Sequence, residues 1–334
     1  VAEAENNVYA VADGTLYSYG KSDDNIRVYS RQTGLSDSDV RLIRYNASTR
    51  TLVIAYANGN IDLMTSDGIY NLPFLKNTTN IQDKTLNAID LSGDRAYLSA
   101  NFGILVLDLK KREVAETYRL DRRTTATALL GGSIYAATDS GLLAAATTDN
   151  LMDVANWKRV SLSSLDFDDQ KIVGLGAFRD RLCFVASGGG LFYRDTDGSI
   201  KTLRKQTNLR GLTVVGNRLV AYTAEAMYVF ASLEGTGEAV SAGTVNGVTA
   251  LTEDGRFWVA SGRNGLVGLR RRAEGQYEKA ISGLKIEGPK RNEDDFMIVD
   301  RGRLWVVGGS YTNTARGNRR GTLMSCVDKK WTNF

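Results

Sequence analysis

One short pattern recurs seven times along the chain. Each copy has a turn that contains Gly, Asp or Asn or ends in a basic residue, followed by a run of apolar and aromatic residues, and the copies begin about 40 residues apart. The runs are Leu52-Val53-Ile54, Ala96-Tyr97-Leu98, Ile134-Tyr135-Ala136, Leu182-Cys183-Phe184, Leu219-Val220-Ala221, Phe257-Trp258-Val259 and Leu304-Trp305-Val306. A repeat of this length indicates one supersecondary unit used many times, and it constrains the fold more than any other feature.

Each copy of the pattern predicts four antiparallel strands. A short apolar run before the tight turn, such as Val40-Arg41-Leu42-Ile43, is expected to form the innermost strand, and the aromatic run forms the second. In their second strands, Trp258 and Trp305 are each expected to pack between adjacent sheets. A third strand and a more polar fourth follow, as in Glu113 to Tyr118. Five copies have a glycine in the turn between the second and third strands: Gly59, Gly103, Gly141, Gly190 and Gly265. Four such strands per unit are typical of a β-propeller blade.

The repeats therefore predict an all-β chain, with a seven-bladed β-propeller of four-stranded antiparallel blades over residues 34–334. Residues 1–33 offer three more strands, around Val8, Leu16 and Ile26, without a recognisable first strand. They form either an incomplete eighth blade, so that eight blades are the alternative, or a partial blade that completes a neighbouring domain. The second interpretation is favoured because open sheet edges are usually paired, and it implies that the natural protein continues past Phe334.

Composition argues against catalysis. The 334 residues contain no histidine, which removes the commonest general base and the commonest metal ligand together. We therefore expect a non-enzymatic protein with no catalytic residues, no metal site and no cofactor. The segment Asp195-Thr196-Asp197-Gly198 is similar to the opening of a calcium loop but lacks its later ligands, so it predicts an ordinary turn. Cys183 and Cys326 are expected to be free thiols, because they fall on different strand types three blades apart.

Charge and hydropathy exclude other classes. The formal net charge of +4 arises from interspersed basic and acidic residues without a basic arm, so a nucleic-acid partner is not expected. No stretch approaches the ~18 apolar residues of a membrane span. The chain starts without a basic region followed by an apolar one, so the protein is either cytosolic or has already lost a signal peptide.

Basic residues are predicted to gather on one face. Because successive strands of a blade alternate in direction, the loops before the innermost strands and the turns between second and third strands emerge on the same side. Arginine clusters of this kind suit the carboxylates or phosphates of an anionic partner, although a merely solvated surface is the alternative. The candidate binding residues are Arg122, Arg123, Arg210, Arg263, Arg291, Tyr311 and Arg316, the last two in a long loop from Gly308 to Gly321.

Carboxylates are also predicted near this face, before two of the innermost strands. A cation site or an acid/base pair there is one interpretation, and a solvated turn is the commoner one. The residues concerned are Asp166, Asp168, Asp169, Glu293, Asp294 and Asp295.

The first repeats resemble known propellers. Gly34-Leu35-Ser36, followed by Val40 and Ile43, resembles the repeat of the regulatory propellers in hybrid two-component sensors of Bacteroidetes. More specific are the stretches Thr51 to Leu63 and Ala96 to Lys110, which are similar to the N-terminal propeller of the PorZ family. The resemblance is strong from about residue 8 to 120, and beyond that only the blade pattern persists.

The resemblance implies a function that composition alone does not. PorZ-like proteins are surface components of the type IX secretion system that associate with the sortase machinery and handle anionic lipopolysaccharide. Family members are longer, with a second propeller and a C-terminal β-sandwich. The resemblance thus predicts a secreted cell-surface or periplasmic scaffold whose partners are an anionic glycan or lipopolysaccharide, secretion-system proteins, or both. The alternative is the periplasmic oligosaccharide-sensing propeller of a hybrid two-component system, and the downstream gene sequence would separate the two.

Overall fold

A computed structural model describes residues 1–162, 171–249, 256–285, 288, 295–308, 321–328 and 330–334. Within these ranges the chain is built almost entirely of β-strands, with one short helix, α1 (Phe74–Asn77), and three single 3-10 turns, η1 (Arg31–Thr33), η2 (Val154–Asn156) and η3 (Gly262–Asn264). The all-β class predicted from the repeat is confirmed.

The described strands form eight four-stranded antiparallel sheets. The first four sheets are β1–β4 (Ala2–Glu3, Asn7–Ala12, Thr15–Gly20, Ile26–Tyr29), β5–β8 (Val40–Asn46, Thr51–Tyr56, Ile61–Thr65, Gly68–Leu72), β9–β12 (Leu86–Ser92, Arg95–Ala100, Gly103–Asp108, Glu113–Arg119) and β13–β16 (Thr124–Leu130, Ser133–Thr138, Gly141–Ala146, Lys158–Arg159). The other four are β17–β20 (Ile172–Phe178, Arg181–Ala186, Gly190–Arg194, Ile200–Arg204), β21–β24 (Gly211–Val215, Arg218–Tyr222, Met227–Phe230, Glu238–Val240), β25–β28 (Gly247–Thr249, Phe257–Ala260, Leu266–Arg271, Tyr277–Leu284) and β29–β32 (Phe296–Asp300, Arg303–Gly308, Thr322–Val327, Lys330–Asn333).

Strand order within every sheet follows the chain, so each sheet is a meander of hairpins. All seven apolar-aromatic runs lie in the second strand of a sheet, as the repeat predicted. The glycines of the second turns have positive φ angles, for example +137° at Gly103, where an added Cβ would lie 2.1 Å from the carbonyl oxygen of Tyr118. Only glycine fits this position, because a side chain would be both strained and obstructed.

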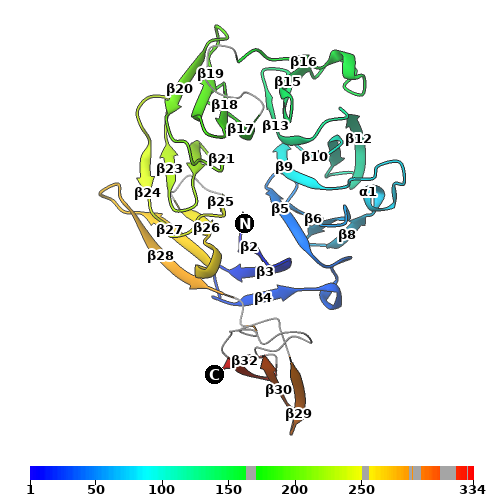
Figure 1. Cartoon of the computed structure of the whole chain (residues 1–334), viewed down its shortest axis with the longest axis vertical. Helices are drawn as coiled ribbons and strands as arrows, with labels where there is room; N and C mark the ends of the chain where they lie inside the picture. The colour runs from blue at the N-terminus through cyan, green and yellow to red at the C-terminus, as the bar shows by residue number, and fades with distance from the viewer. Residues whose placement is uncertain (163–170, 250–255, 286–287, 289–294, 309–320, 329) are drawn as a thin grey trace. The chain divides into compact units, whose positions relative to one another are not determined.

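The chain divides into two compact units, Val1–Leu284 and Lys285–Phe334. Seven sheets belong to the first unit and are arranged as a ring (Figure 1). Their first strands contact one another in the order β1, β5, β9, β13, β17, β21 and β25, and β25 contacts β1 again. The first unit is therefore a ring that closes on itself, with the first strands at its centre.

The sheet of residues 1–33 differs from the sequence prediction in its number of strands. The sequence indicated three strands, and the structure adds a fourth, β1, which pairs with β2 through Ala2 and Glu3. Two residues are too few to show an alternating pattern, so no sequence signal marked this strand. The total of eight sheets fits the eight-blade alternative, while the closed ring of the first unit contains seven.

The core of the ring lies between neighbouring sheets. One cluster joins residues of β6 and β7 to residues of β9, β10 and β11, and similar clusters join the later pairs of sheets. The junction at which the seventh sheet meets the first is also buried. The indole of Trp258 on β26 is fully buried beside Tyr19 of the first sheet, and its Nε1 donates a hydrogen bond of 3.1 Å to Glu3 Oε1. The prediction that Trp258 packs between adjacent blades is confirmed.

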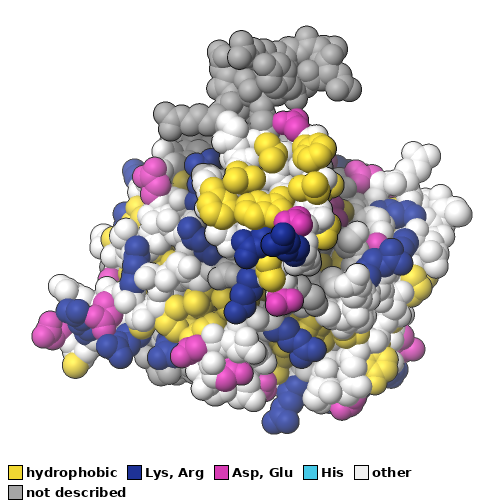
Figure 2. Space-filling model, turned by 90° about the horizontal axis from the view of Figure 1, so that it is seen from below, with side chains coloured by type: hydrophobic (Ala, Val, Ile, Leu, Met, Phe, Trp, Pro, Cys, Tyr) yellow, Lys and Arg dark blue, Asp and Glu magenta, His cyan; other side chains and the backbone are white. Residues whose placement is uncertain are grey.

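The second unit contains the single sheet β29–β32. Phe296, Met297, Ile298 and Val299 of β29 are each more than half exposed, so neither face of this strand is covered within the unit. Trp305 on β30 is only partly buried and stacks on Phe334, because one sheet alone provides no second layer. Whether Trp305 packs between adjacent blades stays a prediction, because its unit is described by itself. Figure 2 shows a patch of hydrophobic side chains on one side of the molecule with lysine and arginine side chains beside it.

Candidate binding site at the basic loop face and central channel

The first unit has one face formed by the loops that precede the first strands and by the turns between second and third strands; we call it the entry face. Arg123 lies directly before β13 and Arg210 directly before β21, and both side chains are exposed. Since the first strands line the centre of the ring, both arginines stand close to the mouth of the channel that these strands enclose. The sequence predicted both residues for this face.

Arg122 links the two kinds of loop directly. Its Nη1 donates a hydrogen bond of 2.8 Å to Ser140 Oγ, in the turn between β14 and β15. The loop before a first strand and the second turn of the same sheet therefore meet, as the alternation of strand direction requires. Arg122 remains exposed while it makes this bond, so part of its guanidinium is open to a partner.

Arg263 lies in η3, between β26 and β27, and its side chain is exposed. The turn is closed by backbone hydrogen bonds from Asn264 to Ser261 and from Gly265 to Gly262, which hold the residue in place. Arg263 lies in the turn between the second and third strands of its sheet. It is therefore on the entry face, as are Arg122, Arg123 and Arg210.

Several predicted residues lie outside the described part of the chain. They are Arg291, Tyr311 and Arg316 of the candidate binding set, and Asp166, Asp168, Asp169, Glu293 and Asp294 of the carboxylate clusters. Their roles stay predictions.

Sequence reasoning missed Lys171. It stands directly before β17, in the same position as Arg123 before β13 and Arg210 before β21, and it is exposed. The signal was present, because all three basic residues precede the first residue of an innermost strand. With Lys171 the entry face has a basic residue at the start of three first strands.

The arginines on the opposite face are already paired. Arg270 and Arg272, at the turn between β27 and β28, form ion pairs of 2.8 and 2.5 Å with Glu278, and Arg271 lies 3.5 Å from a carboxylate oxygen of Glu238. These hydrogen bonds from Arg272 and Arg270 lower the pKa of Glu278. Much of the positive charge on this turn is thus neutralised by the protein itself.

The centre of the ring contains two cavities. One, of about 380 Å³, is lined by the end of β1, by β5 and by the later parts of the other first strands. The other, of about 510 Å³, is lined by the beginnings of the first strands, which are the ends nearer the entry face. The two cavities share six lining residues, so they are halves of one channel that meet at this level: Arg44, Ile89, Asp90, Leu175, Leu212 and Thr213. We call this level of the channel the waist.

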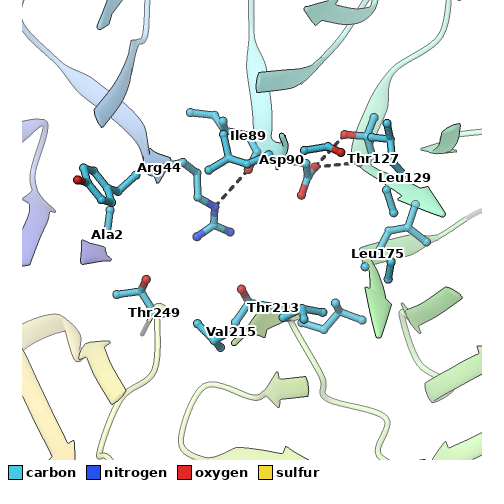
Figure 3. Close-up of a pocket in the computed structure, with 18 of the residues that line it drawn as sticks. Ala2, Arg44, Ile89, Asp90, Thr127, Leu129, Leu175, Thr213, Val215 and Thr249 are labelled. Atoms are coloured by element: carbon cyan, nitrogen blue, oxygen red, sulfur yellow. Dashed lines mark hydrogen bonds between the residues drawn. The ribbon is translucent and has the colours of Figure 1, made fainter. Parts of the chain in front are cut away.

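Side chains of the first strands bridge from one sheet to the next at the channel wall. Arg44 Nε on β5 donates a hydrogen bond of 3.2 Å to the Ile89 carbonyl on β9. On β13, the backbone N and the Oγ1 of Thr127 donate bonds of 3.0 and 2.9 Å to Asp90 Oδ2 (Figure 3). The free edge of an innermost strand has unpaired backbone groups, and these side chains satisfy some of them.

The environment of Asp90 changes its acidity. Removal of the carboxyl from water raises its pKa, and the hydrogen bonds from Thr127 and the charge of Arg44 lower it less, so the net shift is upward. Arg44 and Asp90 were not candidates from the sequence, because Asp90 is one charged residue in a mostly apolar strand and Arg44 is one of two arginines on β5, with no pattern to separate it from Arg41. No sequence pattern shows that their side chains reach the same level of one channel.

Other chemistry proposed from the sequence has structural explanations. Asp195, directly after β19, forms ion pairs with Arg181 on β18 and Lys201 on β20, the strands on either side of β19, so the calcium-like segment is a salt-bridged turn. Both cysteines are free, and burial raises the pKa of the Cys183 thiol to about 12, which makes it unreactive. Among the residues that the structure describes, no group of three or more potential metal ligands comes together, and no helix could cross a membrane.

Comparison with known families and structures supports the resemblance found in the first repeats. A family model described as TSS9, PorZ, N-terminal beta-propeller domain matches residues 8–158. Among curated proteins none matches the sequence. The solved structure of PorZ from Porphyromonas gingivalis, an essential bacterial surface component of the type IX secretion system, is 30% identical with a TM-score of 0.86. The match covers 100% of this chain and 44% of PorZ, so the chain spans less than half the length of its relative.

Two more distant structures share the fold alone. The computationally designed Ika8 protein is 13% identical with a TM-score of 0.56, over 91% of this chain and 92% of that protein. A chain of the mitotic checkpoint complex is 12% identical with a TM-score of 0.55, over 88% of each. Both matches reflect propeller geometry. The chain is thus similar to PorZ over its whole length, and its residues 8–158 belong to the family of the PorZ N-terminal β-propeller domain.

Proposed function

We propose that this chain is a non-catalytic binding and scaffold propeller of a type IX secretion system, at the cell surface or in the periplasm. Its partners are an anionic glycan such as lipopolysaccharide and proteins of the secretion system, including the sortase machinery. The observation that carries the proposal is the similarity to PorZ over the whole chain, at 30% identity and a TM-score of 0.86. The entry face is the surface through which the chain binds the glycan.

The chemistry of the entry face supports an anionic ligand. Arg122, Arg123, Arg210 and Arg263 are exposed, and no ion pair is recorded for them in the described part of the chain. Guanidinium groups bind phosphates and carboxylates through two parallel hydrogen bonds, which gives both affinity and orientation. Arg291, Tyr311 and Arg316 are proposed to belong to the same surface.

Substitution of the entry-face arginines tests the proposal. Arg123, Arg210 and Arg263 are changed together to alanine, and binding to immobilised anionic lipopolysaccharide is measured by surface plasmon resonance. Each charge-assisted hydrogen bond contributes about 1.5 kcal/mol or less at an exposed site, so the triple variant should bind about tenfold more weakly or worse. Its melting temperature should stay close to that of the wild type, because none of the three side chains is buried.

The matched control removes three arginines from the opposite face. Arg270, Arg271 and Arg272 are changed to alanine, which lowers the net charge by the same amount. This variant should keep affinity within about twofold, and added salt should weaken the wild-type complex. Equal affinities of the two triple variants would show that overall charge, and not the entry face, determines binding.

A further inference from the structure

The waist of the channel is large enough for a small molecule. The two cavities that meet there have volumes of about 380 and 510 Å³, within the range of sites that hold small ligands. Among the described residues that line both cavities, one is a cation, Arg44, and one is a carboxyl, Asp90. The remaining polar side chain at this level is the hydroxyl of Thr213, on the far side of the channel (Figure 3).

Arg44 presents a fixed and incompletely used guanidinium. The bond from Nε to the Ile89 carbonyl fixes the plane of the group, and Figure 3 shows its two Nη atoms directed into the open channel. The structure records no ion pair for Arg44 with any described residue. A guanidinium held by Nε alone offers its two terminal nitrogens to a planar acceptor such as a carboxylate.

Asp90 has one oxygen in use and one open. Both hydrogen bonds from Thr127 go to Oδ2, and no bond to Oδ1 is recorded among the described residues. Figure 3 shows the second carboxyl oxygen of Asp90 directed into the open channel. A carboxyl oxygen in this position accepts a hydrogen bond from a hydroxyl group.

We propose that the waist binds a small hydroxy-carboxylic acid of the size of one sugar acid. Its carboxylate accepts two hydrogen bonds from the Nη groups of Arg44, and one of its hydroxyl groups donates to Asp90 Oδ1. Thr213 is positioned to contact a second hydroxyl from the opposite wall. A bare dianion fits less well because of the neighbouring Asp90, and a cation is repelled by Arg44.

The site is independent of the proposed function. The glycan-binding arginines lie on the outer loops of the entry face, whereas Arg44 and Asp90 are in the channel. The ligand is either a free sugar acid or the acidic end residue of a glycan chain that enters through the larger cavity. The two sources share the same chemistry at Arg44 and differ in length.

The test uses glucuronate as the probe and glucose as its neutral counterpart, with binding to the full chain measured by calorimetry and ligand-observed NMR. The wild type should bind glucuronate and not glucose. Arg44→Gln should weaken glucuronate binding about tenfold or more, since a charge-assisted pair is lost. Arg95→Gln is the matched control, because Arg95 on β10 lines neither cavity and already pairs with Glu116 at 3.0 Å. It should change the affinity less than about twofold.

Arg44→Lys and an oligosaccharide that ends in glucuronate complete the experiment. Arg44→Lys keeps the charge but loses the two-pronged geometry, so it should be intermediate, and it serves in place of Arg44→Gln if that variant does not fold. Binding of the oligosaccharide but not of free glucuronate, with the same dependence on Arg44, identifies a glycan end as the ligand. If the wild type binds neither probe, or if the Arg44 variants bind as tightly as Arg95→Gln, the proposal is overturned. Lipopolysaccharide binding by the entry-face triple variant tests only the proposed function. Its outcome does not bear on glucuronate binding at the waist.

Discussion

Trp258 occupies the junction at which the ring of the first unit closes. Its indole is fully buried, lies 5.6 Å from the ring centroid of Tyr19, and donates to the nearly buried carboxylate of Glu3. Glu3 also accepts from Lys21 Nζ at 3.0 Å within the first sheet, so the carboxylate that binds the indole of the seventh sheet is itself held by a charged partner. This one side chain connects residues that are far apart in the sequence.

Replacing Trp258 by alanine should therefore destabilise the first unit strongly. The change leaves a large cavity and removes the donor to Glu3, and we expect a loss of about 3–5 kcal/mol in the free energy of unfolding, measured by urea denaturation. Phe74→Ala is the matched control in the same unit and should cost about 1 kcal/mol or less, because that ring is 48% exposed. A loss below about 1 kcal/mol for Trp258→Ala would be inconsistent with ring closure at this residue.

At the scale of elements, the loop before β5 is held to its own sheet by one carboxylate. Asp37 accepts hydrogen bonds from Lys76 in α1 at 2.7 Å and from Asn58 in the turn between β6 and β7 at 2.6 Å. Partial burial opposes ionisation of Asp37, but the hydrogen bonds from Lys76 and Asn58 outweigh it and lower the pKa to about 2. The ionised carboxylate thus fastens three elements together.

The lowered pKa of Asp37 makes part of the stability dependent on pH. Its contribution is fully present above the ordinary carboxyl pKa of about 4 and is lost as the pH falls through about 2. Asp37→Asn should therefore destabilise the protein at pH 7 by about 1 kcal/mol more than at about pH 2, as measured by urea denaturation at both values. Asp39→Asn, in the same loop, removes a side chain that is half exposed and is the control. An equal effect of Asp37→Asn at the two pH values would exclude the ionised network.

The elements with a strong local signal were predictable from the sequence. The second strands, with their apolar-aromatic runs after a tight turn, all occur where the repeat indicated. In the ring, burial on both faces imposes the same residue types each time. β1 was missed because two residues show no period. Strand direction alone was enough to predict that Arg123 and Arg210 lie in loops directly before first strands, near the centre of the ring.

The channel site was beyond sequence reasoning for a physical reason. Arg44 and Asp90 come from different sheets, and they line one channel because their first strands, β5 and β9, contact each other at the centre of the ring. A repeat predicts the number and order of strands but not which side chains extend past the innermost edge. Trp305 shows the same limit, because its burial depends on what lies beside its sheet and not on its own strand.

For the whole molecule, the central claim is that the entry face of the first unit binds an anionic glycan. The face combines basic residues from several sheets, so a ligand that contacts it should protect loops that are distant in sequence but close to one channel mouth. The binding surface is therefore built by the ring as a whole, and no single loop would be sufficient to bind the glycan.

Amide hydrogen exchange with and without purified anionic lipopolysaccharide tests this claim most directly. Backbone amides around Arg122 and Arg123, around Arg210 and around Arg263 should exchange more slowly in the complex, while those of the turn at Arg270 to Arg272 should not change. Slowed exchange at that turn alone, or no slowing at any of the entry-face loops while the glycan is bound, would contradict the account.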